Sequence, residues 1–357
     1  SCNPIINPNR KMELTELLEK IESELKSGTH RFPLSYTQKA DYLFCMYECV
    51  CRVPKQEIES LQQRIEAVVV TIATQGCTAP VRRLAKKVIM KTLQEGRASR
   101  RSENVNEFMK IAANHKFCVS ARCTALDVVA GVITQFKTLP AAEELLEVNK
   151  KALKSNEKTI KVFSVKALEA LLSAKSLSSS LAQEALRFLL KTLHEKQPEV
   201  SAKGSKALLE LVKNFPESVV ACLEALVQGC VKGFEKLGET NLVEVLALTL
   251  SVHLEPSQPL KSSRKSFEDP PKNVVEVLTC VKSYFNKQTS HNCRTGIVLC
   301  LGKVFASHLR KELVHVSDTK IFLDALINFP RKGSANDLEN WRVSELVSWL
   351  ATRCIST

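Results

Sequence analysis

The residue types that could hold a metal ion come together at one point only. His115, Cys118 and Cys123 lie within a short segment, but zinc sites are built from paired Cys-x-x-Cys elbows, and no second pair follows. Cys49 and Cys51 are two residues apart, so on a helix their side chains point in different directions. The sequence therefore does not favour a metal site, and we expect no cofactor.

Catalytic motifs are also missing from the sequence. It contains no Gly-rich phosphate loop, no Gly-x-Ser-x-Gly elbow and no His-Glu-x-x-His zinc motif. Acidic residues such as Glu143 and Glu147 lie three or four residues from lysines, which is typical of surface ion pairs on a helix. We predict that the protein is not an enzyme; an enzyme with an unrecognised site is the third-ranked interpretation. Five of the seven histidines lie near predicted helix ends or turns: His115, His253, His291, His308 and His315.

Positive charge is the strongest compositional bias. The chain has 51 Lys and Arg against 38 Asp and Glu, a formal net charge of +13. Two basic clusters fall in segments predicted to be loops, and charge alone does not choose among nucleic acid, anionic membrane and acidic peptides as partners. Nucleic acid is the less favoured of these, because stacking aromatic residues are absent beside the first cluster. The candidate contact residues are Arg97, Arg100 and Arg101 in the first cluster and Lys261, Arg264 and Lys265 in the second.

Two serines beside these clusters are candidate phosphorylation sites. Ser102 and Ser266 follow basic residues, a context that basophilic kinases recognise. A phosphate there would reverse the local charge. Serine is also simply common in loops, so both interpretations stay open.

Cysteine usage and hydropathy indicate a cytoplasmic protein. The chain has 13 cysteines, an odd number, and most sit among apolar neighbours, as reduced thiols do. No run of 18 uncharged apolar residues is present, so we predict no transmembrane segment. Residues 1–11 have no apolar core and are not a signal peptide.

The elements that position all these residues recur about every forty residues. A small residue occupies an equivalent place in each repeat, and the steps between these places are 40, 40, 42, 40, 40 and 49. A small side chain with an apolar residue four positions later lets two helices approach closely. This period, with two helices in each repeat, is typical of HEAT-type arrays. The small residues are Cys45, Ala85, Ala125, Ala167, Ala207, Ala247 and Gly296.

Helical periodicity, broken by Pro and Gly at the turns, predicts an all-α fold. We expect a HEAT/armadillo-type α-solenoid of about eight antiparallel helix pairs. The predicted helices cover residues 13–26, 36–50, 55–74, 81–93, 103–114, 117–136, 140–153, 159–172, 181–193, 198–213, 216–231, 241–253, 273–285, 293–309, 318–329 and 341–355.

The predicted domain organisation is a single solenoid over residues 12–357. Residues 1–11 are interpreted as a disordered or vector-derived leader. Residues 255–272 hold four prolines and the second basic cluster without apolar periodicity, which predicts a flexible inserted loop. The last predicted helix has no capping residue after it, so we expect the chain to be part of a longer solenoid.

Several short motifs resemble the amino-terminal end of one family. They are residues 12–14 (MEL), 36–44 (YTQKADYLF), 78–86 (TAPVRRLAK), the basic segment and following helix at 261–278, and 294–297 (RTGI). Together, over residues 12–310, they resemble the HEAT repeat-containing protein five family, large helical accessory proteins of clathrin adaptors. No binding residue of that family is carried over to this chain.

The resemblance implies a cytosolic scaffold that is peripheral at the trans-Golgi network, endosomes and endocytic vesicles. Its expected roles are clathrin-adaptor sorting, retrograde transport from endosome to Golgi, endocytosis and protein localisation. The expected partners are the clathrin adaptor and its accessory proteins, with peripheral contact to anionic membrane as a further option. The alternative is a basic nuclear or nucleic-acid-associated HEAT-repeat scaffold or a transport receptor.

Overall fold

The computed structural model describes residues 13–26, 34–220, 222–237, 240–254, 281, 284 and 290–308. Within these ranges the chain forms fourteen helices and no strand, which confirms the all-α prediction. The chain divides into two compact units, Ser1–Leu177 and Ser178–Thr357, and each is described by itself.

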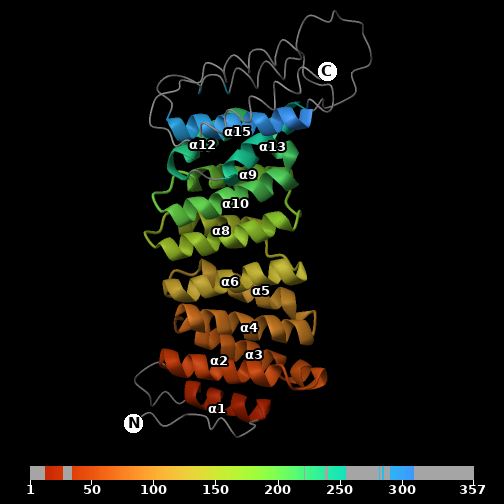
Figure 1. The fold of residues 1–357 in the computed structure, drawn as a ribbon. Coiled ribbons are helices and arrows are strands. Elements are labelled where there is room, and N and C mark those ends of the chain that lie inside the picture. Colours follow the sequence, from red (N-terminus) through yellow and green to blue (C-terminus); the bar gives the residue numbers. More distant parts are fainter. Residues whose placement is uncertain are drawn as a thin grey trace, which may run out of the picture. The chain divides into compact units, whose positions relative to one another are not determined.

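Unit 1 is built from four helix pairs in two layers. Each helix packs on the next one along the chain within its pair, and short turns make the partners antiparallel. The even-numbered helices also pack on one another in succession, as the odd-numbered ones do (Figure 1). The helices are α1 (Leu14–Lys26), α2 (Tyr36–Val50), α3 (Lys55–Thr74), α4 (Ala79–Glu95), α5 (Arg100–Ala113), α6 (Val119–Phe136), α7 (Ala142–Leu153) and α8 (Lys158–Ser173).

Local sequence signals define the start of α2 and the end of α3. Ser35 and Gln38 form a capping box that satisfies exposed amides at the start of α2. After α3, Gly76 has a φ of +90°, a conformation that residues with a side chain rarely adopt. Lys39, only 1% exposed, donates hydrogen bonds from its Nζ to the carbonyl oxygens of Gln75 at 3.2 Å and Gly76 at 2.9 Å. A buried lysine from α2 thus satisfies carbonyl groups that the end of α3 leaves open.

The repeating small residues of unit 1 fall one on each even-numbered helix. Ala85, Ala125 and Ala167 are completely buried on α4, α6 and α8, and Cys45 is half-buried on α2. Residues 121–130 of α6 are buried without exception. The small positions of α4, α6 and α8 therefore lie in the core, on helices that pack on one another in succession.

Unit 2 continues the same plan. Helix α9 packs on α10 and α12 packs on α13, while α10, α13 and α15 pack in succession. Ala207, Ala247 and Gly296 lie on these last three helices. A Cβ at Gly296 would lie 2.7 Å from two ring carbons of Phe234, so the absence of a side chain is needed there. The helices are α9 (Ser179–Thr192), α10 (Pro198–Asn214), α11 (Pro216–Val220), α12 (Leu223–Leu237), α13 (Thr240–Leu254) and α15 (His291–His308).

The prediction of one helix over residues 216–231 was wrong. The structure has two helices there, α11 ending at Val220 and α12 beginning at Leu223. Helix α11 packs against α9 and α13, whereas α12 packs against α13 and α15. The apolar sequence contains no Gly or Pro at the break, so no local signal predicts it. The helix ends there because its two parts pack against different neighbours.

Several predictions lie outside the described residues. They are the leader at 1–11, the inserted loop at 255–272 and the helices at 318–329 and 341–355; of the helix predicted at 273–285, only residues 281 and 284 are described. A single solenoid over residues 12–357 also stays a prediction.

Candidate protein-binding surface

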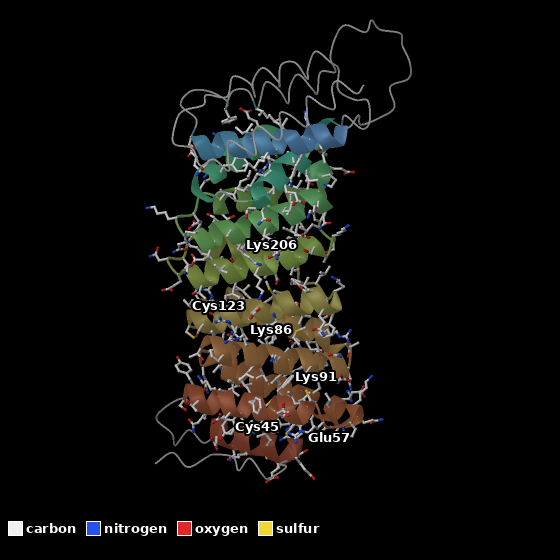
Figure 2. The ribbon with its side chains drawn as sticks, viewed as in Figure 1. Cys45, Glu57, Lys86, Lys91, Cys123 and Lys206 are labelled. Carbon is white, nitrogen blue, oxygen red and sulfur yellow. The ribbon has the colours of Figure 1, made fainter. Side chains whose placement is uncertain are left out.

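Helix α4 carries an unusual row of cations on its outer side. Arg82 and Lys86 are four residues apart, and so are Arg83 and Lys87, which places each pair on one side of the helix. The only acidic residue of α4 is Glu95, which accepts a 2.7 Å hydrogen bond from Lys91. Figure 2 labels Lys86 and Lys91 at separate points along this helix. The first half of α4 thus has no anion of its own to balance four cations.

One buried carboxylate on the next even-numbered helix meets part of this charge. Asp127 of α6, whose side chain is 7% exposed, accepts hydrogen bonds from Nζ of Lys86 at 2.9 Å and Nζ of Lys166 at 2.8 Å. Burial opposes ionisation of the carboxyl, but the two ammonium groups outweigh it, so the pKa of Asp127 lies below its usual value. The ion triad ties α4, α6 and α8 together.

Aromatic rings hold two further cations without neutralising them. The Arg82 guanidinium lies 4.5 Å from the centre of the Phe163 ring on α8. The Lys87 ammonium lies 5.7 Å from the centre of the Tyr47 ring on α2. A ring face attracts a cation through its quadrupole but carries no net charge. These contacts therefore orient both side chains and leave their full charge at the surface.

Helix α2 adds exposed aromatic area beside the cations. Tyr36 is 55% exposed and Phe44 is 54% exposed, and both are among the few large apolar side chains exposed in the described residues. Tyr36, Phe44 and Tyr47 follow one another at spacings of eight and three residues. These spacings place the three rings on the same side of α2. We name the whole surface the cationic-aromatic face. It consists of Tyr36, Phe44 and Tyr47 on α2, Arg82, Arg83, Lys86 and Lys87 on α4, and Lys166 on α8.

The first predicted basic loop is only partly a loop. Helix α5 begins at Arg100, so Arg100, Arg101 and Ser102 are helical, and only Arg97 of the candidates lies before the helix. Arg100 makes ion pairs with Glu103 and with the buried Glu66, 2.6 Å away. The loop prediction was wrong because these ion pairs extend the helix towards its N-terminus, over residues 100–102, which show no apolar periodicity.

Arg101 is also engaged inside the protein. Its Nε donates a hydrogen bond to the carbonyl oxygen of Leu93 at 3.3 Å, and its guanidinium lies 4.4 Å from the centre of the Phe136 ring. The backbone amide of Arg97 donates to Oε1 of Gln62 at 2.7 Å, while the Arg97 side chain is exposed. Of the first cluster, Arg97 is thus the residue best placed for an outside contact.

The other site candidates remain predictions. Lys261, Arg264, Lys265 and Ser266 lie outside the described residues. Ser102 is exposed in the first turn of α5, where a phosphate would lie near the positive end of the helix dipole. Its phosphorylation stays a prediction.

The residues considered for zinc do not form a ligand set. His115 and Cys118 are exposed, whereas Cys123 is completely buried on α6, and burial raises the pKa of its thiol to about 12. In the ranges that the structure describes, no three His, Cys, Asp or Glu side chains gather at one point. Cys123 is therefore a core thiol.

Sequence reasoning missed Arg82, Arg83, Lys86 and Lys87 as candidate contact residues. A signal was present, because two adjacent basic pairs at a spacing of four share a helix with only one acid. The roles of Asp127, Phe163 and Lys166 had no such signal, since they lie about one or two repeats away in the sequence.

Helix α6 is long and apolar enough to cross a membrane by length and hydropathy, with a mean hydropathy of 1.2 over 18 residues. It is 67% buried inside the protein, where α4, α5 and α8 pack on it, and it carries Arg122 and Asp127. Core helices of repeat proteins pass the same test, so the finding is weak evidence for a span.

No protein-family model matches the chain, and no curated protein matches it in sequence. Among solved structures it is similar to karyopherin Kap121p bound to Ste12p, with a TM-score of 0.49 and 13% identity over 96% of this chain and 37% of that one. An engineered protein gives a TM-score of 0.44 and 14% identity over 95% of this chain and 82% of that one. The chain thus spans about a third of Kap121p, 37% of its length. At these values the likeness carries no functional assignment.

Proposed function

We propose that the protein is a non-enzymatic HEAT-repeat scaffold that binds protein partners in clathrin-adaptor-linked vesicle traffic. The observation that carries the proposal is the cationic-aromatic face. It combines arginine with exposed tyrosine and phenylalanine, the residue types that contribute most to protein interfaces. These side chains stand on stacked helices, which hold them in place before a partner arrives.

The perturbed titratable groups support a scaffold rather than a reactive centre. Against the effect of burial, two ammonium groups lower the pKa of Asp127, whereas burial raises the pKa of Glu66 against the effect of Arg100. Both carboxylates form ion pairs between neighbouring repeats. Asp127 lies 2.8 Å from Nζ of Lys166, and Glu66 lies 2.6 Å from the guanidinium of Arg100. Their shifts are accounted for without a substrate.

The link to vesicle traffic comes from the sequence resemblance. Two of the motifs that carry it, residues 36–44 and 78–86, lie on α2 and α4, the helices that supply most of the cationic-aromatic face. We propose that the protein acts at the trans-Golgi network, endosomes and endocytic vesicles, with the clathrin adaptor and its accessory proteins as partners.

The positive charge favours a second candidate function. A net charge of +13 suits a nuclear or nucleic-acid-associated scaffold, or a transport receptor, as well as it suits an adaptor accessory protein. Salt-dependent retention on nucleic acid would favour this candidate.

Proximity labelling of the full-length protein in cells tests the proposal. We expect clathrin adaptor subunits to be labelled above a control in which the labelling enzyme is expressed alone. Labelling dominated by nuclear or nucleic-acid-bound proteins, with adaptor subunits at the control level, would overturn the trafficking role.

A further inference from the structure

The clustered positive charges of α4 destabilise that helix. Like charges four residues apart destabilise a helix by about 0.2–0.5 kcal/mol per pair, and Arg82/Lys86, Arg83/Lys87 and Lys87/Lys91 are three such pairs. Arg82 and Arg83 also stand near the helix N-terminus, where the dipole disfavours cations. Sequences depart from local preference in this way mainly at functional sites.

Ion pairs with other helices neutralise little of this charge. Among the described residues, Asp127 is the one carboxylate that pairs with the cations of the cationic-aromatic face. Arg82 and Lys87 meet aromatic rings, and Arg83 is exposed with no ion pair to another described side chain. Five cations therefore share one carboxylate, and the excess charge stays available to a ligand.

Carboxylates limit the face on both flanks. On α2, Asp41 and Glu48 lie three residues before and four residues after Phe44, so they border the face on the side away from Tyr47 and Lys87. On α8, Glu169 lies three residues beyond Lys166 and away from Phe163. A long polyanion or a bilayer would cover these carboxylates together with the cations, whereas a short segment can place its acidic groups over α4 and only its apolar side chain at Phe44.

We infer that the cationic-aromatic face is the docking site for a short acidic segment of a partner protein that also carries a bulky apolar side chain. The acidic groups pair with Arg83, Lys87 and the outer side of Arg82, and the apolar side chain packs against Phe44 and Tyr36. The ion triad at Asp127 keeps Lys86 and Lys166 in place below the segment. This inference rests on the proposed function only in taking the ligand to be a protein.

Selection of peptides on the whole protein tests the chemistry of the ligand. The probe is a displayed library of random peptides about 12 residues long, enough to span the i to i+7 anchors of a helical ligand. We expect the enriched peptides to be acidic and to share an aromatic or large aliphatic residue. Enrichment of basic or uncharged peptides would overturn the inference.

Charge reversal then tests the site. The enriched peptide, labelled with a fluorophore, is titrated against the wild type and the double variant Arg83→Glu/Lys87→Glu, whose positions are exposed. We expect Kd to rise about tenfold or more, because two charge contacts become repulsive. The matched control Lys110→Glu/Lys151→Glu makes the same charge change at exposed positions of α5 and α7, and Kd should stay within about twofold.

A second variant separates the apolar anchor from charge. Phe44→Ala removes the ring from an exposed position on α2 and leaves every charge unchanged. We expect a rise in Kd of about tenfold with no change in the salt dependence of binding. Circular dichroism melting shows whether each variant keeps the helical fold. Unchanged Kd in a folded Arg83→Glu/Lys87→Glu variant would overturn the inference.

Two other probes cover the remaining anionic ligands. Vesicles of phosphatidylcholine and phosphatidylserine, and a single-stranded oligonucleotide, are tested with the same variants. Tight binding of either probe that Arg83→Glu/Lys87→Glu abolishes, without any selected acidic peptide, would assign the face to membrane or nucleic acid and overturn the inference. Peptide binding without adaptor labelling in cells would leave this inference standing and remove the trafficking role.

Discussion

At the scale of single residues, two pairs of cations in unit 1 have different uses. Arg100 and Arg101, expected to lie in a contact loop, are bound to Glu66, Glu103 and the Leu93 carbonyl oxygen. Arg82 and Lys87 lie against aromatic rings and form no ion pair with another described side chain. The first group stabilises the array, and the second remains available to a partner. Sequence alone shows both groups as runs of basic residues.

Replacing Asp127 with Asn should destabilise unit 1. The substitution leaves Lys86 and Lys166 without their carboxylate, and because their side chains are 27% and 38% exposed, solvent offsets part of the loss. We expect the free energy of unfolding to fall by about 1–3 kcal/mol, less than for a fully buried ion pair. Urea denaturation followed by circular dichroism measures it.

The control for this substitution is Glu147→Gln, which removes the exposed ion pair with Lys150 and should leave stability unchanged. The pKa of Asp127 is lowered in the folded state, so its stabilisation is present above its unfolded value of about 3.9 and is lost as pH falls through the folded value. An Asn variant whose deficit at pH 7 does not shrink as the pH is lowered below about 3.9 would contradict the assignment.

Thiol reactivity should follow burial. Cys51 and Cys118 are exposed, whereas Cys123 and Cys230 are completely buried, and burial raises the pKa of both buried thiols to about 12. At pH 8 we expect iodoacetamide to modify the exposed pair rapidly and the buried pair only after denaturation, because the thiolate is the reactive form. Peptide mass spectrometry reads the rates; equal rates at Cys118 and Cys123 would count against the core placement of α6.

At the scale of helices, packing overrides local preference in several places. Gly204 lies within α10, where helix propensity alone would favour alanine by about 1 kcal/mol. A Cβ at this position would lie 2.9 Å from the Cβ of Thr192 and closer still to its Oγ1. Thr192 is completely buried at the end of α9, so it has little room to move. The close contact of α9 and α10 therefore requires glycine.

Gly204→Ala should thus destabilise the protein although it raises helix propensity. We expect a loss of about 1–3 kcal/mol from overpacking, measured by urea denaturation. Gly229→Ala in α12 is the matched control, because its Cβ would meet the end of the Leu190 side chain, with Cδ2 2.8 Å away, which can shift. Stabilisation by Gly204→Ala would show that the two helices are not in close contact.

At the scale of the whole molecule, contacts between repeats are local. In unit 1, α2 packs on α4, α4 on α6 and α6 on α8, and in unit 2, α10 packs on α13 and α13 on α15. Stability in such arrays is approximately a sum over repeats and their neighbours. A substitution should therefore loosen the repeats that it touches and not the entire chain.

Hydrogen exchange monitored by mass spectrometry checks this expectation. Asp127→Asn should speed amide exchange in α4, α6 and α8 and leave α12 and α13 unchanged, because only the first three helices share the ion triad. Gly204→Ala should give the opposite pattern, with faster exchange in α9 and α10. Uniformly faster exchange in both variants would instead indicate a single cooperative unfolding unit.

The amino-acid sequence by itself determined the helices and their repetition. Apolar spacing, turn residues and one small residue in each repeat are local or periodic features, so the all-α fold and the positions of Ala85, Ala125 and Ala167 were predictable from it. The extended start of α5 and the break between α11 and α12 were not, because ion pairs and packing partners from other helices set them.

Only the tertiary structure decided which charges share a surface. Lys86, Asp127 and Lys166 are about forty residues apart in succession, and stacking of repeats brings their side chains within 3 Å, at 2.9 and 2.8 Å. Phe163 likewise reaches Arg82 from two repeats away. Charge pairing depends on distance in space, and in a repeat protein that distance is set by helix stacking, which no local pattern in the sequence records.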